Sequence, residues 1–220
     1  MKKALPFAKG GTRILRECFF LLFSLFLIGC VGAGKPQLQI ERYLIDYPAP
    51  VFEKQVPIDD ALRVERFTIA SAYNNQNIIF RRDNYILDSF NYNRWAVNPA
   101  DMVGDNLLRD MQQSGLFRAV FSRYALDEGR YILQGGVEEF FLRIDKTGHA
   151  AVVSLEITLK DIKQREATKR ILFQKKYREE ELLETRSPKG CCKAMSLAME
   201  RLSRRISTDV YQTIKTAPLQ

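Results

Sequence analysis

The sequence predicts an α/β (α+β) fold in which two main helices pack on a mixed, largely antiparallel sheet. Two observations lead to this prediction. Segments of strand and helix character follow one another as strands, helix, strands, helix, an order that favours a sheet with helices packed on it. Two long neighbouring segments, 131–144 and 153–160, also have the pattern of an antiparallel hairpin.

Short strands are predicted for the first part of this domain. Pro48 and Pro50 end the first strand, and 82–84 is a polar turn that joins two others into a hairpin. The strands are expected at 40–47, 62–67, 78–81 and 85–88.

The first helix has clear signals at both ends. Asn98 can cap it, Pro99 takes the first helical position, and Asp101 can meet the exposed amides of the first turn. Apolar residues recur at helical spacing as far as Met111, and Ser114-Gly115 ends the helix.

The second half is predicted to hold the longer strands and the second helix. Gly135-Gly136 is expected to form a bulge, and the alternation in 153–160 leaves one face of the sheet buried and the other wet. Strands are expected at 117–124, 131–144, 153–160 and 171–177, followed by an amphipathic helix from Ser187-Pro188 to about Ile214.

The N-terminal region has the order of a bacterial secretory signal. Basic residues precede an apolar run over 18–29, which is too short for a membrane span of about 20 residues. The run ends in Leu27-Ile28-Gly29-Cys30, the pattern of a lipoprotein signal. We therefore predict a leader at 1–29, lipidation of Cys30 with acyl chains such as palmitate, a tether at 30–37 and one domain at 38–217. Val31 favours the periplasmic face of the outer membrane over the inner membrane.

Composition argues against a nucleic-acid partner. The first 29 residues hold five Lys or Arg and one Glu, so half of the formal net charge of +8 leaves with the leader. The rest has no basic stripe with interleaved aromatic residues.

The adjacent pair Cys191-Cys192 is left after the leader and the lipidation site are set aside. Two neighbouring cysteines join each other only in a strained ring. The simplest interpretation is that they are two small residues near the start of a helix. The alternatives are an intermolecular disulfide bond or a role as metal ligands. No second group of Cys or His supplies further ligands, so we expect no metal and no cofactor.

Catalytic motifs are missing from the sequence. It has one histidine, His149, and no Gly-x-Ser-x-Gly elbow, Walker loop or His-Glu-x-x-His motif. The neighbouring carboxylates Glu138 and Glu139 are expected on opposite faces of a strand, where they form a poor acid–base pair. We predict that the protein is not an enzyme.

The remaining distinctive cluster is Tyr92-Asn93-Arg94-Trp95, with Arg81 upstream. Trp95 is the sole tryptophan, and it can pack in the core or form an exposed anchor for a partner chain. Arg81, Tyr92, Arg94 and Trp95 are therefore the candidate partner-binding residues.

At this cluster the sequence resembles the ABC-type transport auxiliary lipoproteins, which include the PqiC lipoproteins. The resemblance rests on the lipobox cysteine, Tyr43-Leu44, Val64 to Thr68, Tyr73 with Ile78 to Arg82, Asn93 to Ala96 with Pro99, and Val137 to Phe140. It extends over nearly all of residues 40–215.

The resemblance implies a fold similar to the N-terminal domain of TolB. It also implies a non-catalytic component of an MCE/ABC-type system that moves lipids between membranes. Such a component is expected to be oligomeric and to dock on the MCE substrate-binding protein beside the permease and ATPase. The competing hypothesis is a stand-alone outer-membrane lipoprotein that acts in envelope assembly or binds protein or glycan.

Overall fold

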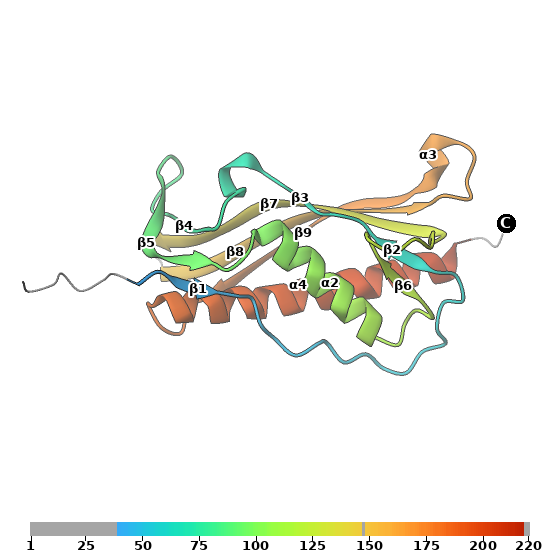
Figure 1. The fold of residues 1–220 in the computed structure, drawn as a ribbon, viewed down its shortest axis with the longest axis horizontal. Coiled ribbons are helices and arrows are strands. Elements are labelled where there is room, and N and C mark those ends of the chain that lie inside the picture. The colour runs from blue at the N-terminus through green and yellow to red at the C-terminus, as the bar shows by residue number, and fades with distance from the viewer. Residues whose placement is uncertain (1–38, 147, 218–220) are drawn as a thin grey trace, which may run out of the picture. The chain divides into compact units, whose positions relative to one another are not determined.

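The computed structural model describes residues 39–146 and 148–217. In this part of the chain, nine strands form one mixed sheet, and α2 (Pro99–Gln113) and α4 (Pro188–Thr216) pack on it (Figure 1). The strands are β1 (Glu41–Tyr43), β2 (Leu62–Val64), β3 (Thr68–Ile69), β4 (Asn77–Arg81), β5 (Leu87–Trp95), β6 (Val120–Ser122), β7 (Tyr131–Asp145), β8 (Gly148–Asp161) and β9 (Ile171–Leu182). The predicted fold class is confirmed. The leader, Cys30 and the tether lie outside the described residues.

Strand β7 organises the sheet. Along one edge it pairs in parallel with β2, then β3, then β4. Along the other edge it forms the predicted antiparallel hairpin with β8, and β9 extends that ladder. Beyond β4 lie β5, antiparallel to it, and β1, parallel to β5. Each parallel pairing covers only two or three residues of a strand. The antiparallel pairings are longer and provide most of the hydrogen bonds between strands.

The two helices cover the apolar face of the sheet. Helix α4 packs along β8 and β9, and α2 packs on β7 and against α4 (Figure 1). Helix α2 begins as predicted, because the Asn98 side chain accepts a hydrogen bond from Ala100 N and Pro99 occupies the first position. It also ends as predicted, with Ser114 as its C-cap. Two shorter helices, η2 (Ser71–Tyr73) and α3 (Ala167–Arg170), lie outside these layers. In the described residues, no helix is both long and apolar enough to cross a membrane.

Several predicted boundaries differ from the structure. Strand β1 is much shorter than 40–47, and β6 is shorter than 117–124. The strand expected at 85–88 begins only at Leu87, because the Asp83 carboxylate accepts hydrogen bonds from the amides of Tyr85 and Ile86 and holds them in a turn.

The predicted bulge is displaced along β7. The register shifts between Val137 and Glu139, not at the glycines. Gly135 serves close packing instead, since a Cβ there would lie 2.0 Å from Cε1 of Phe67. The glycine thus lets the Phe67 ring lie directly against the sheet beneath α2.

Candidate interaction surface

Trp95 lies in the core. Its side chain is 1% exposed and its ring meets Phe140 edge-on, with the ring centroids 5.4 Å apart. The core-packing interpretation of Trp95 is therefore correct, and its assignment as an exposed partner-binding anchor is wrong. The reason is its place at the end of β5, where pairing with Tyr43 of β1 and packing on β7 enclose it.

Arg81 and Arg94 do not form one patch. Arg94 pairs with Asn77 and donates a 2.9 Å hydrogen bond to its Oδ1, and its Nε is buried without a hydrogen-bond partner. Asn77 lies at the other end of β4 from Arg81, about 13 Å away at the usual rise of a strand. The Arg81 guanidinium lies 4.8 Å from the centroid of the Phe141 ring and donates to the carbonyl of Asn84.

Tyr92 is the exposed member of the predicted cluster. Its side chain is 45% exposed on β5, next to the short edge strand β1. The four predicted residues therefore do not form one site. Trp95 is in the core and Tyr92 is on the surface. The two half-buried arginines lie at opposite ends of the β4–β5 ladder.

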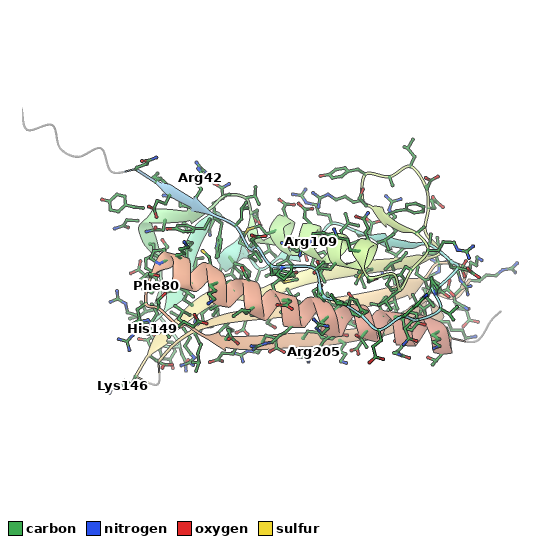
Figure 2. The ribbon with its side chains drawn as sticks, turned by 90° about the horizontal axis from the view of Figure 1, so that it is seen from below. Arg42, Phe80, Arg109, Lys146, His149 and Arg205 are labelled. Carbon is green, nitrogen blue, oxygen red and sulfur yellow. The ribbon has the colours of Figure 1, made fainter. Side chains whose placement is uncertain are left out.

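A buried polar network, which the sequence reasoning missed, lies where α2 meets α4. Asp110 is fully buried, and its Oδ2 accepts hydrogen bonds from the hydroxyls of Tyr47 at 2.8 Å and Ser203 at 2.5 Å. Its Oδ1 accepts two bonds from Arg109, whose guanidinium lies over the Tyr47 ring. Burial and the Asp110 carboxylate raise the pKa of Tyr47. Figure 2 shows Arg109 close to α4. The network joins the β1–β2 connection to both helices, and its complete pairing indicates a structural role.

A second network lies at the N-terminal end of β7. Arg130 donates to both oxygens of Asp161, at 3.1 and 2.9 Å, and to Oδ2 of Asp60 at 2.7 Å. Burial alone would raise the pKa of Asp161, but the hydrogen bonds from Arg130 and from the amide of Lys163 outweigh it, so the pKa is lowered. The one signal in the sequence for these networks is an aspartate within each otherwise apolar pattern: Asp110 in α2 and Asp161 at the end of β8.

The bulge in β7 brings two carboxylates to the same face of the sheet. Glu138 pairs with Lys176 at 2.6 Å, and Glu139 pairs with Arg178 at 3.1 Å, both across from the helices. The expectation that Glu138 and Glu139 face opposite sides is therefore wrong, because the inserted residue breaks the alternation. Each carboxylate has its own basic partner, and the Lys176 hydrogen bond lowers the pKa of Glu138. The pair is a salt-bridge ladder rather than an acid–base couple.

The adjacent cysteines lie at the start of α4. Cys191 and Cys192 are free and buried at the start of α4, which agrees with their interpretation as two small residues near a helix start. Among the residues that the structure describes, no group of three or more His, Cys, Asp or Glu side chains could hold a metal ion.

Three surface hollows have volumes of about 360, 270 and 240 Å³. They lie beside the start of α2, beside Arg130, and between Phe52 and α4. Pockets that enclose a drug-sized ligand have volumes of about 300–1,000 Å³. The hollow beside the start of α2 lies near the lower limit of that range, and the other two lie below it.

Comparison with known proteins identifies the family. The family model described as "ABC-type transport auxiliary lipoprotein component" matches residues 43–207, which covers β2 to β9 and most of α4. The chain belongs to this family. The auxiliary lipoprotein has no match among curated proteins. The match confirms the resemblance that the sequence showed.

Solved structures share the fold of this auxiliary lipoprotein. Protein XCC0632 from Xanthomonas campestris, of the family DUF330, is 17% identical, with a TM-score of 0.65 over 80% of this chain and 95% of that one. A second, uncharacterised protein is 14% identical, with a TM-score of 0.61 over 78% of this chain and 99% of the other. At such identities the likeness shows the fold alone.

Proposed function

We propose that this auxiliary lipoprotein is a non-catalytic component of an MCE/ABC-type system that moves lipids between membranes. It is anchored by acyl chains on Cys30 to the periplasmic face of the outer membrane and docks the MCE substrate-binding protein. The observation that carries this proposal is the family match over residues 43–207, together with the lipobox that ends at Cys30.

The sizes of the surface hollows support docking rather than carriage of lipid. Lipid tails must stay shielded from water during transfer. The three hollows are small and lined in part by charged side chains such as Arg66, Asp101 and Glu53, which suits neither two acyl chains nor their apolar surface. These three hollows therefore favour a path shielded by the partner, and we propose that this domain receives the partner at the membrane.

Tyr92 is our candidate for the partner contact within the predicted cluster. It offers the exposed aromatic surface that protein interfaces favour, beside the strand where the tether enters the domain. Arg81, the last residue of β4, lies next to the tip of the β4–β5 hairpin and offers a half-buried positive charge for the same contact. We propose that several copies surround the partner as a homo-oligomer.

Crosslinking in intact cells, followed by purification from the membranes, tests this function. We expect an MCE protein or the permease to be recovered with the wild-type protein, and recovery to fall for Tyr92→Ala. Tyr124→Ala is the matched control, because Tyr124 is an exposed tyrosine on the loop after β6. Recovery of envelope-assembly proteins or glycan, with no transport subunit, would support the stand-alone lipoprotein instead.

The anchor has its own measurement. Mass spectrometry of the purified N-terminus should show an acylated Cys30, and Cys30→Ser should move the protein from the membrane to the soluble fraction. An unmodified leader in the wild-type protein would contradict the anchor.

A further inference from the structure

The tip of the β4–β5 hairpin exposes three consecutive apolar residues. Tyr85 is 94% exposed, Ile86 is 54% exposed and Leu87 is 44% exposed. Single exposed apolar side chains are ordinary on protein surfaces, but a contiguous set at the tip of a protruding turn indicates a contact.

The tip has a defined conformation. Oδ1 of Asp83 accepts hydrogen bonds from the amides of Tyr85 at 2.7 Å and Ile86 at 2.8 Å. These two bonds lower the pKa of the Asp83 carboxyl group, which therefore stays ionised at neutral pH. The turn thus presents the apolar side chains to the solvent in a conformation that hydrogen bonds from its own backbone stabilise.

The tether enters the domain at the same end as this tip. Strand β1 runs parallel to β5 with Glu41 beside Asn93, so the chain preceding Glu41 is directed toward the Leu87 end of β5. Leu87 itself pairs with Arg81, the last residue before the tip. Figure 2 shows Arg42 of β1, Phe80 of β4 and Lys146 at one end of the sheet.

The length of the tether limits how far this end can lie from the anchor. Gln39, the first described residue, lies nine residues after Cys30. Fully extended, this stretch spans about 30 Å at most. An acylated Cys30 therefore keeps Gln39 within about 30 Å of the bilayer surface, which leaves the hairpin tip within reach of that surface.

The exposed loop after β6 lies at the opposite end. Strand β6 pairs with β2, which pairs with β7 at Tyr131, whereas β4 pairs with β7 at Leu142. These two positions on β7 are about 36 Å apart at the usual rise of a strand. Leu126, which is fully exposed on that loop, therefore provides a reference position at the other end of β7 from the hairpin tip.

We propose that the tip formed by Tyr85, Ile86 and Leu87 inserts into the surface of the bilayer that holds the acyl chains of Cys30, and so fixes the orientation of the domain on the membrane. This inference rests on the proposed anchor at Cys30. Tyrosine suits the headgroup region and isoleucine and leucine suit the acyl boundary below it. The tether holds the tip at a high effective concentration near the surface, so three side chains suffice for a weak contact.

The charges around the tip predict how the contact depends on lipid. Arg81 and Arg82 are offset by Asp83 and Asp88, so the tip carries no excess of positive charge. Apolar insertion should therefore proceed on zwitterionic lipid as well as on anionic lipid, unlike a polybasic contact.

An environment-sensitive fluorophore on Ile86→Cys in the full-length lipidated protein tests the proposal. The matched control is Leu126→Cys, and the native Cys191 and Cys192 are buried. The protein is reconstituted into vesicles of phosphatidylcholine, alone or with phosphatidylglycerol, that contain lipid with a doxyl quencher. We expect a blue shift and quenching at position 86 in both lipids, neither effect at position 126, and loss of the quenching when Tyr85 and Leu87 are also changed to Ser.

Each other outcome has a distinct meaning. Flotation with the vesicles without quenching at position 86 would overturn the insertion while leaving the anchor intact. A blue shift without quenching would show that the tip is covered by protein, and would also overturn the proposal. Failure of the protein to float would refute the anchor at Cys30 and this inference with it.

Discussion

The Tyr47 hydroxyl donates a 2.8 Å hydrogen bond to Oδ2 of Asp110, a residue 63 positions further along the chain. Ser203 of α4 donates to the same oxygen. One carboxylate therefore joins the β1–β2 connection, α2 and α4 at a point from which water is excluded. The stability of the helical layer should depend on this carboxylate more than on any exposed ion pair.

Asp110→Ala should lower the free energy of unfolding by about 3 kcal/mol, because it leaves the buried hydroxyls and Arg109 without their acceptor. Urea unfolding followed by circular dichroism measures the change. Asp105→Ala on the same helix removes an exposed carboxylate and should alter stability by less than about 0.5 kcal/mol. Equal effects of the two substitutions would refute the structural role of the network.

Gly135→Ala should destabilise the fold by about 1–3 kcal/mol, since its Cβ would overlap the Phe67 ring. Gly104→Ala approaches the same ring from α2, but at 3.5 Å, an ordinary contact. That substitution should be neutral or stabilising because alanine favours a helix. Thermal unfolding of the two variants shows whether the cost comes from overlap at Gly135 or from any added methyl group beside the Phe67 ring. A stabilising Gly135→Ala would contradict the close packing at this glycine.

Arg130→Met should be most destabilising at neutral pH, where it leaves Asp161 buried and ionised without its partner. The folded-state pKa of Asp161 lies below its ordinary value of 3.8, so the ion pair stabilises the wild-type above that value and the gain is lost as the pH falls through the lowered pKa. The difference in unfolding free energy between wild-type and variant should therefore shrink below about pH 4.

Arg118→Met is the control for this pH dependence, because Arg118 pairs with Asp59 in solvent. It should have little effect at any pH. A difference for Arg130→Met that stays constant from pH 7 to pH 3 would show that packing, rather than the ionised carboxylate, accounts for its cost.

The thiols of Cys191 and Cys192 should react slowly with a water-soluble disulfide reagent in the native protein. Both are buried, which keeps the reagent from their sulfur atoms. The hydrogen bond with Cys192 together with burial also raises the pKa of Cys191, so little Cys191 thiolate forms at neutral pH. Reaction should become rapid in urea. Leu126→Cys provides a fully exposed thiol for comparison, and fast native labelling of the wild-type would show that the start of α4 opens readily.

Local chemistry explains which parts of the fold the sequence predicted well. The bounds of α2 follow from Asn98 and Pro99, which act on their own helix. The β7–β8 hairpin follows from the alternation in 153–160, the long strand pattern of 131–144 and a short connection. Neither requires knowledge of distant residues.

The errors arise where distant residues decide the conformation. The parallel pairing of β2, β3 and β4 with β7 brings together segments more than 50 residues apart, and no local pattern records it. The burial of Trp95 depends on Phe140, and the close packing at Gly135 depends on Phe67. The candidate site was only partly predicted. Tyr92 is exposed as a contact requires, but the apolar tip was predicted as a strand because the local turn made by the Asp83 carboxylate was not recognised.

The pairing of β1 with β5 also determines how the domain bears a mechanical load. A pull on Gln39 directed back along β1 acts parallel to the strand axis, so the bonds between Glu41–Tyr43 and Asn93–Trp95 are sheared together rather than peeled one after another. Tyr43 adds a further bond, as its carbonyl accepts from the amide of Ala96. This short edge strand is thus placed where it can transmit tension from the proposed membrane tether to the core through Trp95 without unravelling from its edge.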